Sequence, residues 1–157
     1  MISIVVPVLN EEEAVPLLAR KLRDVIKEVT NQYEIIFVDD GSTDQTLVSL
    51  LELKDEVPGL RIVELSRRHG QTAALAAGID SAKGDIIITM DGDLQHDPED
   101  IPRFIEKLGE GYDVVSGWRE TRTDSYFIRR IPSMIANGLM RIVSGIKVKD
   151  FGSTYKA

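Results

Sequence analysis

Short apolar runs alternate with amphipathic segments along most of this chain. The apolar runs are rich in Ile and Val, as buried strands are, and predict strands at residues 2–8, 33–38, 60–65, 85–90 and 113–116. Apolar residues at helical spacing predict helices at residues 11–30, 43–53, 72–84 and 98–108. Because strands that alternate with helices form parallel sheets covered on both faces, the predicted fold class is α/β with a doubly wound, mostly parallel sheet.

Two of the predicted helices begin with polar residues at the spacing of a capping box. Asn10 is followed by Glu13, and Ser42 is followed by Gln45. In a capping box the first side chain accepts a hydrogen bond from a backbone N–H of the first helical turn. We therefore expect Asn10 and Ser42 to be the N-caps of these helices.

The alternation of strands and helices stops after residue 118. Residues 126–144 are apolar-rich and amphipathic, and Pro132 predicts a kink or a break within them. The last eight residues, DFGSTYKA, predict the beginning of a further strand. We therefore divide the chain into an α/β core, residues 1–118, and a further segment of the same domain, residues 119–157.

The length and composition of the chain favour a single soluble globular domain. The chain has 157 residues, of which 43% are hydrophobic and 29% charged. The absence of cysteine excludes disulfides, thiolate metal sites and a cysteine nucleophile. No apolar run approaches the roughly 20 residues that cross a bilayer, and the N-terminus lacks the basic region of a signal peptide. The only histidines, His69 and His96, lie in separate predicted loops, where we expect both to be exposed.

Charge is distributed unevenly along the chain, whose formal net charge is −7. Residues 1–118 hold 11 basic and 23 acidic side chains, a net charge of −12, whereas residues 119–157 hold 8 basic and 3 acidic side chains, a net charge of +5. A basic segment on an acidic body favours an anionic partner, such as a phosphate group or a membrane surface, although a merely solvated basic face fits equally well. Nucleic acid fits less well because the body is acidic.

The predicted strand at residues 85–90 ends in a cluster of metal-binding side chains. Asp91 and Asp93 flank Gly92, and side chains two residues apart in an extended backbone point the same way. Gln95 adds an amide oxygen close by. Two carboxylates and an amide oxygen suit a hard divalent cation such as Mg²⁺ or Mn²⁺, so Asp91, Asp93 and Gln95 are the predicted metal ligands.

Unusual residues also mark the ends of the first two predicted strands, at residues 7–11 and 39–42. In an open parallel sheet a ligand binds beyond the carboxyl ends of the strands, where the strand order reverses. If these strands are neighbours, one crevice collects five carboxylates, namely those of Glu11, Asp39, Asp40, Asp91 and Asp93. Carboxylates can accept hydrogen bonds from a base or a ribose, and a metal ion can bridge a diphosphate. The chain has no glycine-rich phosphate loop, so the sequence predicts nucleotide binding by carboxylates and metal.

Five ordered motifs carry a family resemblance that extends over essentially the whole chain. They are VPVLNEEE, VDDGSTD, SRRHGQTAALAAG, MDGDLQHDPE and SGWRETR. In order and spacing they resemble the family 2 inverting glycosyltransferases with the GT-A fold, a nucleotide-diphospho-sugar transferase fold. The similarity is closest to the branch of dolichol-phosphate mannose synthase and the bacterial polyprenyl-phosphate glycosyltransferases.

The resemblance implies a role for each motif. The residues implied to contact the nucleoside are Pro7, Leu9, Asn10, Glu11, Val38 and Asp40. The residues implied to face the ribose and diphosphate are Asp91, Gly92 and Asp93, with Asp93 and Gln95 as the foremost metal ligands. Arg119 would meet the diphosphate or the acceptor phosphate. The candidate catalytic residues are Asp93, Asp150 and Arg119.

The activity implied by the resemblance is a metal-dependent, inverting transfer of a sugar. The donor would be a UDP- or GDP-linked sugar and the acceptor a polyprenyl or dolichyl phosphate, at the cytoplasmic face of the membrane. Two alternatives stay open, a non-catalytic module that binds nucleotide sugars and a transferase that acts on a sugar hydroxyl. Members of this branch continue well past a segment like residues 150–152, so we expect this chain to be shortened and donor binding to survive better than transfer.

Overall fold

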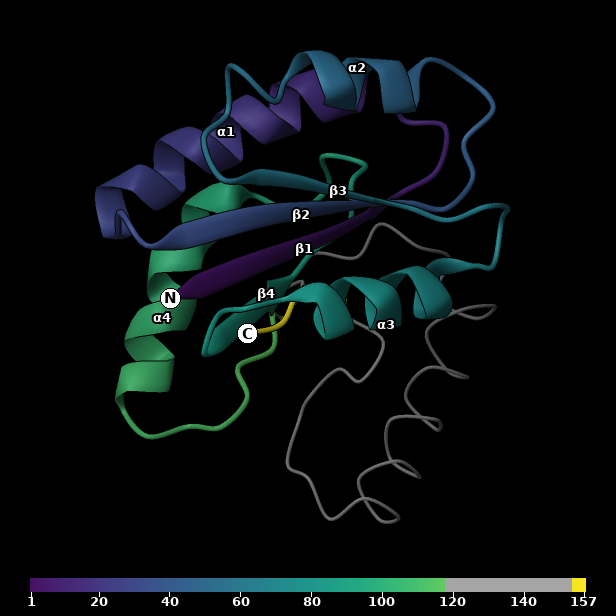
Figure 1. Ribbon diagram of the computed structural model, residues 1–157. Coiled ribbons are helices and arrows are strands. Elements are labelled where there is room, and N and C mark those ends of the chain that lie inside the picture. Colours follow the sequence, from purple (N-terminus) through teal and green to yellow (C-terminus); the bar gives the residue numbers. More distant parts are fainter. Residues whose placement is uncertain (118–153) are drawn as a thin grey trace, which may run out of the picture.

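Four parallel strands form the sheet at the centre of the structure (Figure 1). The computed structural model describes residues 1–117 and 154–157. Along the sheet the strand order is β3-β2-β1-β4. The strands are β1 (Ile2–Val8), β2 (Tyr33–Asp39), β3 (Leu60–Glu64) and β4 (Ile86–Thr89). The predicted α/β class and parallel sheet are therefore confirmed.

Helices cover both faces of this sheet, because side chains alternate between the faces along each strand. On one face, alternate residues of β1, such as Ile4 and Val6, pack into a core with α1, α2 and α4. On the other face, Val5 packs against α3 (Figure 1). The helices are α1 (Ala14–Val29), α2 (Thr46–Glu52), α3 (Gln71–Ser81) and α4 (Ile101–Gly109), the last preceded by the 3₁₀ turn η1 (Pro98–Asp100). No helix in the described ranges is long and apolar enough to cross a membrane.

Helix α3 lies unusually close to the sheet because its packing surface consists of small residues. Ala74 and Gly78 are its buried residues. A Cβ added at Gly78 would collide with the side chains of Val5 and Val38. Any larger residue at this position would push α3 away from the strands that carry it.

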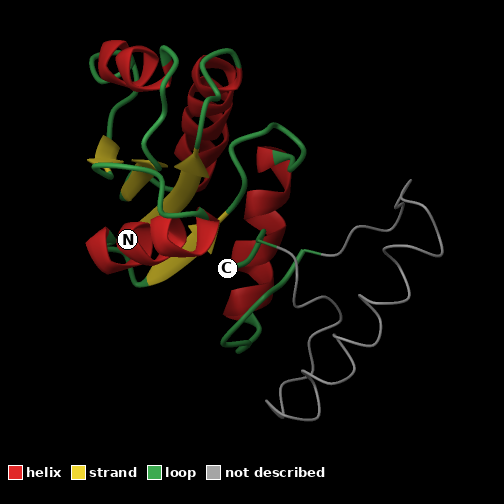
Figure 2. Cartoon of the chain, turned by 90° about the vertical axis from the view of Figure 1, so that its right-hand side faces the viewer, coloured by secondary structure: helices red, strands yellow, loops and turns green. Residues whose placement is uncertain are grey.

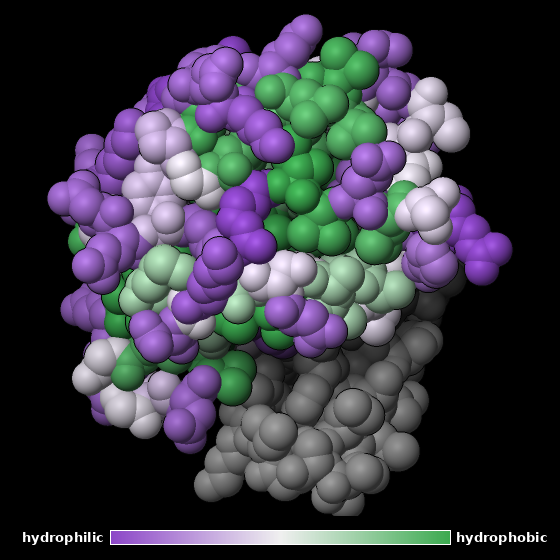
Figure 3. Space-filling model, viewed as in Figure 1, coloured by the Kyte–Doolittle hydropathy of each residue, from purple (hydrophilic) through white to green (hydrophobic). Residues whose placement is uncertain are grey.

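The short helix α2 buries only one side. Leu50 is fully buried, whereas Val48 and Leu51 are exposed by 47% and 51%. Apolar side chains accordingly gather over α2 on the face that Figure 3 shows.

The predicted N-cap at Asn10 is wrong. Helix α1 begins at Ala14, and Glu13 at its N-cap position makes no side-chain capping bond. Asn10 has a left-handed backbone with a φ of 56°, which Asn tolerates better than most residues. Its Oδ1 accepts a hydrogen bond from the Thr43 N–H at 2.8 Å. The side chain therefore connects the loop after β1 to the loop after β2.

The predicted N-cap at Ser42 is also wrong, since α2 begins four residues later, at Thr46. The Ser42 hydroxyl instead donates to Asp39. The carboxylate of Asp44 accepts from the Thr46 N–H at 3.0 Å and from the Thr46 hydroxyl at 2.6 Å. It also accepts from the backbone N–H of Glu12, so this loop is fastened both to the start of its own helix and to the neighbouring loop.

The predicted parallel strand at residues 113–116 is wrong. In the part of the chain that the structure describes, Ser116 pairs with Lys156 as an isolated antiparallel bridge, and Lys156 also bridges Thr89 in antiparallel fashion. The sequence predicts the beginning of a strand at the end of the chain. Lys156 does pair there, with Thr89 on one side and Ser116 on the other. The predicted amphipathic segment at residues 126–144 lies outside the described residues.

A buried ion pair fixes the opposite end of the sheet. Glu34, only 5% exposed, accepts hydrogen bonds from the Ser3 hydroxyl at 2.6 Å, from Arg61 Nη1 at 2.5 Å and from the Lys83 N–H at 2.6 Å. The Ser3 oxygen accepts in turn from the Gly84 N–H. Burial acts to raise the pKa of the Glu34 carboxyl, but these hydrogen bonds together hold that pKa below its ordinary value.

We expect Glu34→Gln to lower the free energy of unfolding by about 2–3 kcal/mol at pH 7, because it breaks a buried ion pair. Because the folded-state pKa is depressed, the ionised carboxylate stabilises the fold above the unfolded value near 4.5, and this stabilisation is lost as the pH falls through the folded pKa. Urea unfolding at a series of pH values from about 3 to about 7, on both sides of the unfolded-state pKa, measures both effects. Glu52→Gln, at an exposed position of α2, is the control. An unchanged pH profile in Glu34→Gln would contradict the prediction.

Candidate functional site

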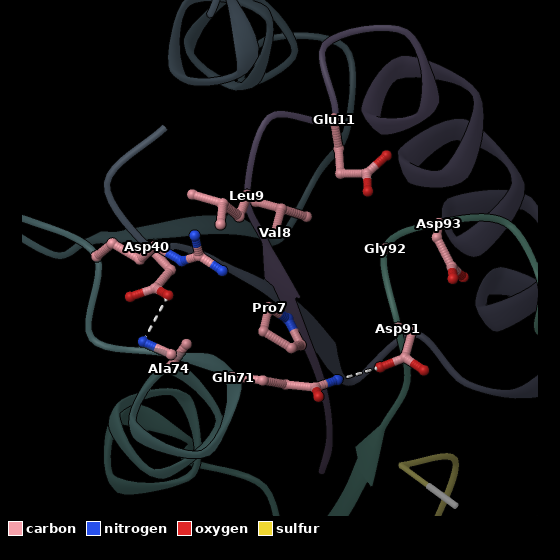
Figure 4. A pocket seen from close by; sticks show the side chains of 12 residues that line it. Pro7, Val8, Leu9, Glu11, Asp40, Gln71, Ala74, Asp91, Gly92 and Asp93 are labelled. Carbon is pink, nitrogen blue, oxygen red and sulfur yellow. Dashed lines mark hydrogen bonds between the residues drawn. The ribbon is translucent and has the colours of Figure 1, made fainter. Parts of the chain in front are cut away.

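The carboxyl ends of β1, β2 and β4 meet at one edge of the sheet, which Figure 2 views end-on. The chain runs outward from β1 to β3 and then returns to place β4 on the other side of β1, so the strand order reverses at this edge. A cleft of about 400 Å³ opens there (Figure 4). Its lining residues are Pro7, Val8, Leu9, Glu11, Asp40, Arg68, Gly70, Gln71, Ala74, Asp91, Gly92 and Asp93. The predicted convergence of the three strand ends is confirmed.

The end of β1 and the loop after it contribute one wall of the cleft and one carboxylate. Pro7 and Leu9 form the wall, and Glu11 lies above them in Figure 4, on the side of Asp93. Burial raises the pKa of the Glu11 carboxyl, and the nearby carboxylates of Asp93 and Asp44 raise it further. Negative charge is therefore concentrated at this end of the cleft, and a cation bound there would relieve the repulsion.

The loop after β2 places one of its two carboxylates in the cleft. Asp40 is 3% exposed and accepts hydrogen bonds from the backbone N–H groups of His69 and Gly70 at 2.6 and 2.8 Å. Asp39 is turned into its own loop, where it accepts from the N–H and the hydroxyl of Ser42. Four of the five predicted carboxylates therefore line the cleft, and Asp39 does not.

The loop before α3 supplies a cation that the sequence analysis did not single out. Arg68 lines the cleft among the carboxylates and forms no ion pair with any other described residue. Gly41 makes its approach possible: its φ is +73°, and a Cβ there would lie 2.6 Å from the backbone carbon of Arg67 and 2.7 Å from the Arg68 nitrogen. The basic pair in the motif SRRHGQ was the available signal for this role.

The loop after β4 begins with Asp91, whose two oxygens are both held by neutral donors. Asp91 Oδ1 accepts from Gln71 Nε2 at 2.6 Å, as Figure 4 shows. Asp91 Oδ2 accepts from the Thr154 hydroxyl at 2.6 Å. The carboxylate is thus fixed between the start of α3 and the end of the chain. No local sequence signal pointed to Thr154, because its role depends on a contact 63 residues away.

Gly92 and Asp93 complete the cleft. A Cβ at Gly92 would lie 2.6 Å from Val8 Cγ1 and 3.2 Å from the Pro7 carbonyl oxygen, so only glycine lets this loop touch β1. The exposed carboxylate of Asp93 accepts from the Gln95 N–H at 3.0 Å through Oδ1. Leu94 between them has a φ of 61°, a strained backbone for a bulky residue.

His96 supports this loop from inside the protein. The expectation that it is exposed is wrong, since only 7% of it is accessible. Its Nδ1 accepts a hydrogen bond from the Asp91 N–H at 3.2 Å, and its ring stacks on Tyr155 at 4.9 Å. Contacts with residues far along the chain therefore bury a histidine that the local sequence places in a polar loop.

The remaining predicted site residues lie away from the cleft lining. Val38 is fully buried against α3, and Asn10 connects two loops as described above. Gln95 is exposed next to Asp93 but does not line the cleft. Arg119 and Asp150 lie outside the described residues. Within the described part of the chain, no three His, Asp or Glu side chains are grouped closely enough to hold a metal ion on their own.

Comparison with known proteins gives close relatives in sequence. The chain is 46% identical over 157 residues to the dodecaprenyl-phosphate galacturonate synthase of Rhizobium johnstonii, a match that covers 99% of this chain and 46% of that protein. It is 43% identical over 158 residues to the undecaprenyl-phosphate 4-deoxy-4-formamido-L-arabinose transferase of Pseudomonas fluorescens, with the same two coverages. The chain thus spans about half the length of these relatives.

Solved structures of other proteins have a similar fold. The glucosyl-3-phosphoglycerate synthase of Mycobacterium tuberculosis superposes with a TM-score of 0.72 at 25% identity, over 99% of this chain and 56% of that one. A mannosyltransferase from Pyrobaculum calidifontis, in complex with GDP-Man and Mn²⁺, has a TM-score of 0.50 at 30% identity, over 59% of this chain and 27% of that one. Residues 3–156 match the family Glycosyl transferase family 2. The chain belongs to glycosyl transferase family 2 and has the GT-A fold.

Proposed function

We propose that the cleft binds the nucleoside diphosphate of a sugar donor, and that the whole protein transfers the sugar, with inversion, to a polyprenyl phosphate. The observation that carries this proposal is the cleft itself, at the point where the strand order reverses, lined by four carboxylates and one arginine. Such a lining offers acceptors for a base and a ribose and a cation for a diphosphate.

The geometry supports one orientation of the donor along the cleft, in which the nucleoside and the diphosphate contact different residues. Asp40 and Glu11, with the wall formed by Pro7 and Leu9, would contact the nucleoside. Asp91 and Gly92 would face the ribose and the diphosphate. Arg68 would add a charge-assisted hydrogen bond to a phosphate oxygen, since guanidinium matches phosphate geometry.

We propose that Mg²⁺ or Mn²⁺ accompanies the donor. The residues present fit such an ion: Asp93 presents an exposed carboxylate with only Oδ1 engaged among the described residues, and it lies near the Glu11 carboxyl, whose pKa is raised by burial and further by the carboxylates of Asp93 and Asp44. Asp93 would hold the ion, with Asp91 and Gln95 beside it and the diphosphate supplying further oxygens. When bound, the ion would supply positive charge to the leaving diphosphate. The mannosyltransferase that resembles this chain was solved with Mn²⁺ and GDP-Man.

The names of the relatives support the proposed acceptor. Two relatives are named for different sugars, but both names contain a polyprenyl phosphate. A phosphate monoester has a second pKa near 6, so this acceptor reaches the site largely ionised and needs positioning more than deprotonation. Asp93 and Asp150 are the candidates for orienting it, and Arg119 for binding its phosphate. We propose that this occurs at the cytoplasmic face of the membrane.

Titration calorimetry of UDP and GDP, each with and without Mn²⁺, tests the donor site. We expect one nucleotide to bind and its affinity to fall at least about tenfold without the metal or in Asp93→Asn, because the diphosphate then loses its bridging charge. Asp55→Asn, at an exposed turn away from the cleft, should change nothing. Equal affinity of Asp93→Asn and the wild type would overturn the metal assignment, and no binding of either nucleotide would overturn the donor site in this chain.

A further inference from the structure

Three hydrogen bonds fix Asp91, one at each side-chain oxygen and one at its backbone. Gln71 Nε2 donates to Oδ1 and the Thr154 hydroxyl donates to Oδ2, each at 2.6 Å. The Asp91 N–H donates to His96 Nδ1 at 3.2 Å, so the backbone of this residue is held as well. The carboxylate of Asp93, by comparison, is held through one oxygen among the described residues, by an N–H of its own loop. The two carboxylates of the β4 loop therefore differ, and Asp91 is the one with a fixed orientation.

The two side-chain donors reach Asp91 from parts of the chain that are distant in sequence. Gln71 is the first residue of α3 and precedes Asp91 by 20 residues, whereas Thr154 follows Asp91 by 63. Figure 4 shows the Gln71 side chain extending from the start of α3 toward Asp91. Both donors are neutral, so they orient the carboxylate and leave its negative charge available to a cation. Each carboxylate oxygen has two lone pairs, and each therefore keeps one for a further partner.

The exposure of Gln71 separates this hydrogen bond from those that hold the fold together. Gln71 is an exposed residue that lines the cleft, and the side chain of Asp91 is 22% exposed. Water can replace an exposed hydrogen bond when one partner is removed, so such a bond contributes little to the stability of the protein. What this bond determines is the direction in which the Asp91 carboxylate points.

We propose that Gln71 and Thr154 are positioning residues for metal-dependent donor binding, and that they hold the Asp91 carboxylate where it meets the metal-bound diphosphate. The inference rests on the donor site proposed above. A carboxylate that is already oriented loses little conformational freedom when the ligand binds, which favours affinity. Removal of the groups that orient a metal-binding side chain commonly lowers metal affinity by about 10- to 100-fold.

Gln71→Met tests the proposal, because it keeps the length of the side chain and removes its N–H donor. In titration calorimetry of the full chain with UDP and GDP, we expect the affinity for the nucleotide that binds to fall about tenfold with Mn²⁺ present and to stay unchanged without it. Thr154→Val should show the same loss, whereas Thr154→Ser retains the hydroxyl and should bind as the wild type does. Thr72→Val, next to Gln71 on α3 but outside the cleft lining, is the matched control and should also bind normally.

Two further measurements distinguish positioning from other roles of Gln71. The urea midpoint of Gln71→Met should equal that of the wild type, and a lower midpoint with unchanged affinity would show a merely structural role and overturn the proposal. Asp91→Ala should weaken binding with Mn²⁺, and adding Gln71→Met to it should cause no further loss, because Gln71 acts through that carboxylate. A further loss, or an equal loss with and without Mn²⁺ in Gln71→Met alone, would overturn the proposal while leaving the donor site intact. If the wild type binds neither nucleotide, the donor site itself is wrong and this proposal falls with it.

Discussion

Asp40→Ala is expected to weaken nucleotide binding by about 100-fold or more, the largest effect of any single carboxylate in the cleft. The Asp40 carboxylate is nearly inaccessible and holds the backbone N–H groups of His69 and Gly70. Alanine leaves both donors unsatisfied, at about 1–3 kcal/mol each, and releases the loop that carries Arg68 into the cleft. Titration calorimetry with the nucleotide that the wild type binds measures the loss.

Two further variants separate the possible roles of Asp40. Asp40→Asn keeps one acceptor oxygen, so we expect an affinity between those of the alanine variant and the wild type. Asp55→Ala, in an exposed turn, serves as the matched control and should bind normally. Thermal unfolding of all three shows whether the fold survives. If Asp40→Ala is folded and binds as tightly as the wild type, Asp40 only braces the loop and does not contribute to nucleotide binding.

The sheet and the position of the cleft could be predicted because both follow from local patterns and one topological rule. Apolar β-branched runs give the strands, and ligands bind at the carboxyl ends of parallel strands where the order reverses. Pro7 lies at the end of β1, and Asp40 and Asp91 follow β2 and β4. Because these strands are neighbours in the sheet, all three residues meet in one cleft. No knowledge of side-chain packing is needed for that inference.

The loops were predicted less well because their hydrogen-bond partners are distant in sequence. Asn10 and Ser42 have the local signature of N-caps, yet Asn10 Oδ1 accepts from the Thr43 N–H and the Ser42 hydroxyl oxygen accepts from the Asn10 N–H, more than 30 residues away in each case. An Asn or Ser side chain gains as much from a backbone group of a neighbouring loop as from its own helix. The capping-box pattern cannot distinguish these two outcomes.

The residues that hold the β4 loop show the same limit more strongly. Thr154 contacts Asp91, and Tyr155 contacts His96, only because Lys156 pairs with Thr89. That pairing is antiparallel, whereas every pair of named strands in the sheet is parallel. A pattern of alternating strands and helices gives no indication of it.

Tyr155→Ala is expected to cost about 3–5 kcal/mol in the free energy of unfolding, because it removes a large buried ring. Tyr155 is 4% exposed, and its ring centroid lies 4.5 Å from that of Phe104 and 4.9 Å from that of His96. Its hydroxyl donates to the Asp97 carbonyl at 2.9 Å. Since the ring supports His96, which accepts from the Asp91 N–H, nucleotide affinity should fall together with stability.

Two matched variants show which part of Tyr155 matters. Tyr155→Phe keeps the ring and loses one hydrogen bond, so urea unfolding should report a cost of only about 1 kcal/mol and calorimetry a near-normal nucleotide affinity. Tyr112→Ala removes a tyrosine that is 58% exposed and should change stability by no more than about 0.5 kcal/mol. If Tyr155→Phe is as unstable as Tyr155→Ala, the hydroxyl rather than the buried ring holds the loop. If Tyr155→Ala retains wild-type affinity, the cleft does not depend on the end of the chain.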